Sequence, residues 1–147
     1  MYFVDRKKIE QHLQYMEQLL QHFNGLSLSE DHVSRYALER IGHLLIECMM
    51  DAGNSIIDGF IMRDPGSFED ILDIMDDEKV IPSQEAASLK HVVALRKQLV
   101  QDYVAVEHQQ VQEVIQINMD ALQSFTKHVR AYLENELGPV SAFLPEN

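Results

Sequence analysis

Apolar residues recur every three or four positions along nearly the whole chain, and this helical periodicity constrains the fold more than any other feature. No segment shows the strict alternation of a β-strand. The sequence therefore predicts an all-α protein, an up-and-down helical bundle of four long helices and one short helix. The expected helices, with their capping residues, cover about residues 5–23, 27–59, 67–75, 82–103 and 107–137.

The expected helix ends rest on capping residues. Asp5 and Ser67 are capping residues for the first and third helices, and Ser27-Leu28-Ser29-Glu30 has the spacing of a capping box for the second. Gly138-Pro139 ends the last helix, because glycine tolerates a left-handed cap and proline cannot continue a helix. We expect residues 1–137 to form one bundle and residues 138–147 an irregular tail.

The composition favours an ordered, acidic protein, and we expect the chain to lie in the cytoplasm. Of its 147 residues 46% are hydrophobic, and 24 acidic side chains against 12 basic ones give a net charge of −12. Such a chain repels nucleic acid unless its few bases are focused on one site. The single cysteine, Cys48, excludes an internal disulfide and a cysteine-rich zinc site. There is no secretory signal and no apolar run long enough to cross a membrane, so we expect no membrane association.

The familiar motifs of metal and nucleotide enzymes are absent. The sequence contains no glycine-rich phosphate loop, no Gly-x-Ser-x-Gly and no His-Glu-x-x-His, and no glutamate is followed three residues later by histidine. Glu39, His43 and Glu47 form a row at four-residue spacing, which we interpret as a solvated helix face with weak side-chain pairs. The sequence therefore predicts no metal site and no cofactor.

Arg96 lies in an apolar helical stripe that includes Leu89, Val92 and Leu99. A guanidinium is almost never fully buried without a partner, because removing its water is expensive. The stripe is thus expected to face a groove or a subunit interface, with Tyr103 on the same face seven residues later. The alternative is an arginine that reaches solvent beside a core tyrosine in a plain bundle.

The segment 96–103, Arg-Lys-Gln-Leu-Val-Gln-Asp-Tyr, resembles the Arg-Asn-x-x-Val-His-x-Tyr motif of the HepT-like ribonuclease family, in the HEPN superfamily. The resemblance extends to Asp51-Ala52-Gly53-Asn54, to Pro65-x-Ser67-Phe68-x-Asp70 and to Val80-Ile81-Pro82. Gln101 stands at the position of the family histidine, and Lys97 at that of the asparagine. His91, five residues before Arg96, is a conceivable substitute, but we interpret it as an exposed helix histidine.

The resemblance implies a bundle that dimerises through the motif helix. It also implies a metal-independent endoribonuclease, the toxin of a toxin–antitoxin pair, silenced when the nucleotidyltransferase antitoxin MntA attaches AMP to the motif tyrosine. The expected partners are RNA, a second copy of the chain and an MntA-like antitoxin. The implied site residues are Arg96, Gln101 and Tyr103 as the catalytic motif, Lys90, Arg96 and Lys97 for RNA, Asp51 and Asn54 in the cleft, and Tyr103 as the AMP acceptor.

Three hypotheses are consistent with the sequence. The first is a HepT-like endoribonuclease attenuated by the loss of its histidine, since a glutamine amide cannot exchange a proton near neutral pH and general acid–base catalysis contributes about 10²–10⁴-fold. The second is a catalytically dead homodimer that binds RNA, a nucleotide or a nucleotidyltransferase. The third is a structural helical dimer without a ligand.

Overall fold

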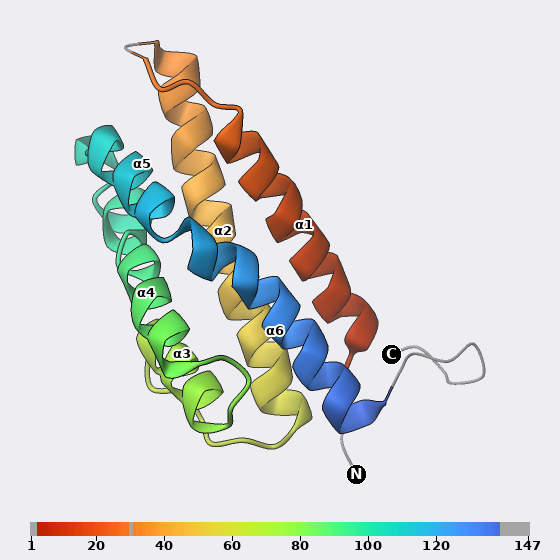
Figure 1. Cartoon of the computed structure of the whole chain (residues 1–147). Helices are drawn as coiled ribbons and strands as arrows, with labels where there is room; N and C mark the ends of the chain where they lie inside the picture. The colour runs from red at the N-terminus through yellow and green to blue at the C-terminus, as the bar shows by residue number, and fades with distance from the viewer. Residues whose placement is uncertain (1–2, 30, 139–147) are drawn as a thin grey trace.

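A computed structural model describes residues 3–29 and 31–138, which fold into six α-helices without a strand in these ranges (Figure 1). The expected all-α helical bundle is confirmed. The helices are α1 (Arg6–Asn24), α2 (His32–Gly59), α3 (Phe68–Asp77), α4 (Ser83–Val93), α5 (His108–Ile117) and α6 (Met119–Leu137). Between α4 and α5 lie a π-helical turn, η1 (Lys97–Gln101), and a 3-10 turn, η2 (Tyr103–Ala105).

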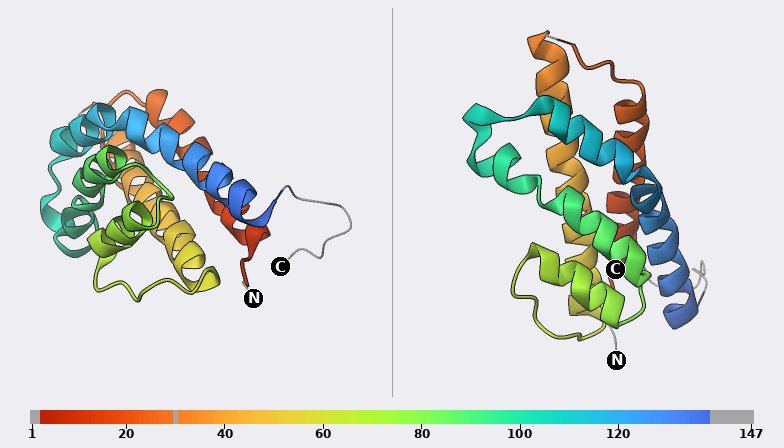
Figure 2. Two further views of the ribbon diagram at one scale, coloured as in Figure 1. Left: turned by 60° about the horizontal axis from the view of Figure 1, so that its bottom comes forward. Right: turned by 60° about the vertical axis from the view of Figure 1, so that its left-hand side comes forward.

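The long helix α2 organises the bundle, because α1, α3, α5 and η1 all pack against it. Helices α1 and α2 run antiparallel side by side, and α6 lies against α1 and α4 (Figures 1 and 2). The first and last helices are joined at one end, where Nη1 of Arg6 donates a 2.7 Å hydrogen bond to the carbonyl of Gly138. The chain thus runs up, down, up and down, with short α3 between α2 and α4.

The core lies between these helices and is built from large aliphatic side chains, methionines and Phe125. Burial of such side chains is the main stabilising contribution to a bundle of this size. Fully buried core side chains from five helices are Ile9, Leu13 and Met16 of α1, Leu45, Met49 and Ile56 of α2, Ile71 of α3, Leu89 of α4 and Phe125 of α6.

The described helices include none that is long and apolar enough to cross a membrane.

Two expected N-terminal helix caps are confirmed and one is wrong. The carboxylate of Asp5 accepts the amide hydrogen of Lys8, and the hydroxyl of Ser67 accepts that of Asp70. The capping box at 27–30 is not the start of α2, which begins at His32 after Asp31. Ser29 instead contacts the hydroxyl of Ser34 in the connection, and Glu30 lies outside the described residues. A capping box stabilises a helix only where its first residue is the N-cap, and here the N-cap is Asp31, four residues after Ser27.

The expected last helix is divided into two at Asn118. Asn118 leaves helical geometry, and its side-chain amide donates a 2.8 Å hydrogen bond to the carbonyl of Val114. The buried polar group is therefore satisfied without a continuous helix. The apolar periodicity continues across the break, which is why it predicted one helix. Helix α6 ends at Leu137, and residues 139–147 of the expected tail lie outside the described residues.

Candidate active site

The motif segment is not the continuous helix that the sequence predicts. Helix α4 ends at Val93, where the amide of Leu95 bonds the carbonyl of Val92 and tightens the last turn. The turn η1 then widens, and its last bond runs from the amide of Asp102 to the carbonyl of Lys97. Turns of this π type occur frequently at functional sites. The seven-residue spacing therefore does not place Arg96 and Tyr103 on one helical face.

The segment is held against α2 by close packing at Gly42. A Cβ at Gly42 would lie 3.2 Å from Cδ1 of Leu99 and 3.6 Å from methyl carbons of Val111 and Ile115. The absence of a side chain at this position allows η1 and α5 to approach α2 closely. Leu99 is buried by this packing, so the turn that follows Arg96 has a fixed place on the bundle.

Arg96 is held from two sides. Its Nε donates a 3.0 Å hydrogen bond to Oε1 of Glu47 on α2, and its guanidinium carbon lies 4.4 Å from the centre of the Phe68 ring. An ion pair and a cation–π contact together fix the plane of a guanidinium. Neither Nη atom of Arg96 makes a hydrogen bond within the described part of the chain. The side chain is 28% exposed, so this free edge can receive an anion from solvent.

The row on α2 lies along the motif segment and is less exposed than the predicted solvated face, while the expected pairing at four-residue spacing is found between His43 and Glu47. Nε2 of His43 lies 3.4 Å from the same Glu47 oxygen that Arg96 contacts. One turn earlier, Oε2 of Glu39 lies 2.8 Å from Nε2 of His108 on α5. All three side chains of the row are partly buried. Their four-residue spacing indicates in the sequence that the three side chains lie on one face of α2. Only the fold brings Arg96 and His108 opposite this face.

Three motif residues on the segment are exposed. The side chains of Lys97 and Gln101 face solvent, Tyr103 is 66% exposed and the adjacent Val104 is 91% exposed. Large apolar groups in such positions are typical of interaction surfaces. Tyr103 is open to another molecule, and no contact joins it to Arg96 within the described chain.

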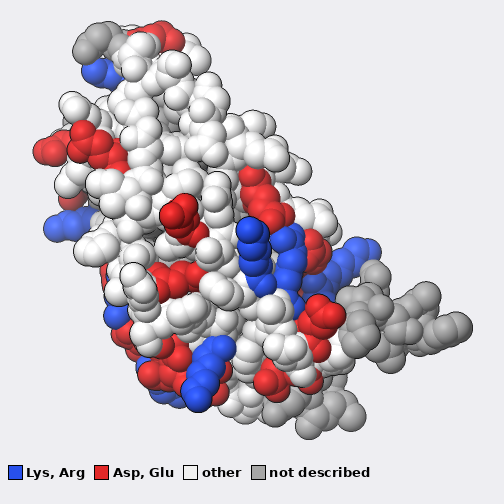
Figure 3. Space-filling model, in the orientation of Figure 1, with Lys and Arg blue, Asp and Glu red and all other residues white. Residues whose placement is uncertain are grey.

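The expected basic cluster is largely neutralised. Lys90 donates a hydrogen bond to the carboxylate of Asp73, which raises the pKa of Lys90, and Arg96 is paired with Glu47. Lys97 is the exposed member of the group. On the face drawn in Figure 3, acidic and basic side chains are interspersed and large areas carry neither. RNA binding at this segment would therefore depend on a few placed cations and not on a broad positive surface.

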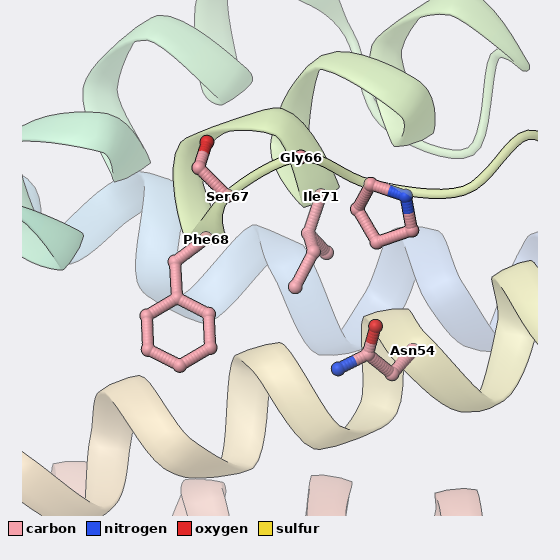
Figure 4. A pocket seen from close by; sticks show the side chains of 6 residues that line it. Asn54, Gly66, Ser67, Phe68 and Ile71 are labelled. Carbon is pink, nitrogen blue, oxygen red and sulfur yellow. The ribbon is translucent and has the colours of Figure 1, made fainter.

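The two residues expected in the cleft occupy different places. Asp51 is exposed and its Oδ2 lies 3.8 Å from Nε2 of His12. Asn54 lines a pocket of about 380 Å³ between α2 and the start of α3, facing Phe68 and Ile71 (Figure 4). Because the Phe68 ring also carries the Arg96 guanidinium, this pocket adjoins the arginine.

No group of three histidine, cysteine, aspartate or glutamate side chains in residues 3–29 and 31–138 could hold a metal ion. Cys48 is buried beside this region, and burial together with the charges of Asp51 and Glu47 raises its pKa to about 11. Its thiol is therefore protonated near neutral pH and is a poor nucleophile.

Comparison with known proteins gives the family. The profile of the family described as "Ribonuclease HepT-like" matches residues 9–129. The protein named "Putative RNase YutE" from Bacillus subtilis (strain 168) is 52% identical over 143 residues, which cover 97% of this chain and 99% of that protein. The chain belongs to the HepT-like ribonuclease family.

Two solved structures share the fold. The structure described as the cytosolic protein of unknown function YutE from Bacillus subtilis has 52% identity and a TM-score of 0.93, over 97% of this chain and all of that one. A toxin–antitoxin crystal structure with AMP-PNP has 17% identity and a TM-score of 0.73, over 82% of this chain and 96% of that one. The second similarity is one of fold.

Proposed function

We propose that the chain is a metal-independent endoribonuclease, the toxin component of a toxin–antitoxin pair, which acts as a homodimer. The observation that carries this proposal is the geometry of Arg96. Glu47 and Phe68 fix the guanidinium from two sides, and its two Nη atoms remain available to a phosphate. A planar fork of this kind matches two phosphate oxygens.

The chemistry needs only a cation and a proton acceptor. RNA carries its own nucleophile, the 2′-hydroxyl next to the scissile phosphate. Arg96 would stabilise the negative charge that develops on the phosphate oxygens during attack. A base must take the 2′-hydroxyl proton, and the amide of Gln101 cannot do so.

The partners we propose are RNA, a second copy of the chain and a nucleotidyltransferase antitoxin of the MntA type. Exposure of Tyr103 and Val104 in the segment that follows the arginine supports a second copy packing on this segment. We also propose a cytoplasmic location, in line with the description of the Bacillus subtilis YutE structure as a cytosolic protein.

We expect Tyr103 to be the AMP acceptor, because its side chain is exposed and its position matches the motif tyrosine. The chain produced together with a small nucleotidyltransferase from a neighbouring gene should gain the mass of one adenylyl group, which is AMP less one water. Peptide fragmentation should place that AMP on Tyr103, and the Tyr103→Phe variant should lack it. An unmodified chain, or AMP retained in the phenylalanine variant, would contradict this assignment.

The proposed activity is tested by measuring cleavage of a single-stranded RNA in EDTA by the wild type and by Gln101→His. We expect the wild type to cleave, and Gln101→His to cleave at least as fast, because it adds the proton carrier of the family motif. Intact RNA with both proteins would contradict a ribonuclease.

The second candidate function is a catalytically dead homodimer that binds RNA, a nucleotide or a nucleotidyltransferase. The observation that favours it is Gln101 at the motif histidine position. In the same assay, a silent wild type together with an active Gln101→His variant would support this candidate. Binding of the RNA by the silent wild type, measured by fluorescence anisotropy, would then define its role.

A further inference from the structure

His43 and Arg96 share one carboxylate oxygen. Nε of Arg96 lies 3.0 Å and Nε2 of His43 lies 3.4 Å from Oε1 of Glu47. The two nitrogens come from elements far apart in the sequence, since Glu47 and Arg96 are separated by 49 residues. An imidazole therefore lies beside the guanidinium to which the phosphate of RNA is proposed to bind.

No other histidine has this relation to Arg96 within the described residues. The chain has seven histidines, and the ones that approach other carboxylates are His12, His108 and His128. None of the carboxylates that these three approach contacts Arg96. His43 is 30% exposed, so part of its side chain is open to solvent.

We propose that His43 supplies the proton transfer that the motif histidine supplies elsewhere in the family. The inference rests on the proposed ribonuclease function and assigns a residue to it. The imidazole takes the proton of the 2′-hydroxyl while the 2′-oxygen bonds to phosphorus. The bond between phosphorus and the 5′-oxygen breaks, and the 5′-oxygen takes a proton from water. The hydroxide so formed recovers the proton from His43, and the products are a 2′,3′-cyclic phosphate and a 5′-hydroxyl.

Glu47 has a positioning role in this arrangement. A carboxylate near Nε2 favours the tautomer that carries its proton on that nitrogen, which leaves the lone pair of Nδ1 as the base. No hydrogen bond to Nδ1 of His43 is found within the described part of the chain. The same oxygen holds Nε of Arg96, so one carboxylate fixes both the base and the phosphate-binding group.

The test is RNA cleavage in EDTA by His43→Gln, with His91→Gln as the matched control. His91 is exposed on α4, near Arg96 in the sequence, and is the rival proton carrier. We expect His43→Gln to lose about 10²–10⁴-fold in rate, the usual contribution of general acid–base catalysis, while its affinity for RNA is unchanged. The pH–rate profile should lose the ionisation that the wild type shows. His91→Gln should retain the wild-type rate and profile.

A double variant distinguishes loss of the proton carrier from loss of packing around position 43. His43→Gln with Gln101→His moves the histidine to the position it has in the family motif, and we expect it to recover most of the rate. If the double variant stays inactive, or if His43→Gln cleaves like the wild type while Arg96→Ala does not, His43 is not the proton carrier and the ribonuclease function stands. If the wild type leaves the RNA intact, both the proposed ribonuclease function and the role of His43 are contradicted.

Discussion

Replacement of Arg96 by alanine is expected to reduce RNA cleavage in EDTA by about 10²–10³-fold, the range found when one donor to a developing oxyanion is removed. The variant loses the two Nη donors proposed to bind the phosphate, and with them the charge that opposes the developing negative charge. Because Arg96 and Glu47 are both partly exposed, the fold should survive. Single-turnover cleavage and thermal unfolding of the same preparation measure the two effects separately.

Two further variants make this result specific. Arg130→Ala removes an arginine of α6 that pairs with Glu10 and Glu17 of α1 and not with the residues that hold Arg96, and it should leave cleavage unchanged. Arg96→Lys keeps the charge but loses the planar fork, and we expect it to recover only part of the rate. Cleavage by Arg96→Ala at the wild-type rate would exclude Arg96 from the reaction. The measured cleavage would then come from another source in the preparation.

Replacement of Phe125 by alanine is expected to lower the free energy of unfolding by about 3–5 kcal/mol, the usual cost of truncating a buried aromatic side chain. Phe125 has no exposed surface and lies on α6, which packs against both α1 and α4. Since small domains are stable by about 5–15 kcal/mol, the variant should be close to unfolding at room temperature.

Urea unfolding followed by circular dichroism measures this loss, with Ile117→Ala as the control. Ile117 is 80% exposed at the end of α5 and its truncation should change stability by less than about 0.5 kcal/mol. A loss below 1 kcal/mol for Phe125→Ala would mean that the core around α6 can collapse around the missing ring.

Local capping rules predicted the starts of α1 and α3, although not that of α2. The starts of α1 and α3 follow from the side-chain oxygens of Asp5 and Ser67, which bond amides three residues ahead. The breaks in the predicted helices at 94–96 and at Asn118 could not be predicted from the sequence, because apolar residues keep their helical spacing across both. At Asn118 the interruption is stabilised by a side-chain hydrogen bond to Val114, and at η1 by packing against Gly42.

The sequence predicted the arginine at the centre of the candidate site but not the residues that surround it. Arg96 was conspicuous because a cation in an apolar stripe requires a partner. That partner, Glu47, and its neighbour His43 were assigned to solvent, since only tertiary packing of η1 on α2 brings them to the arginine. The same packing accounts for the cation–π contact with Phe68, which no spacing along the chain could indicate.

The most direct test of the central claim is the chemical identity of the RNA ends made by the wild-type chain in EDTA. An oligonucleotide with one cleavable ribose and deoxyribose elsewhere, analysed by mass spectrometry, reports both ends of a single cut. Attack by the 2′-hydroxyl, with Arg96 at the phosphate, predicts a 2′,3′-cyclic phosphate and a 5′-hydroxyl. Intact RNA, or a cut that leaves a 5′-phosphate, would contradict this account.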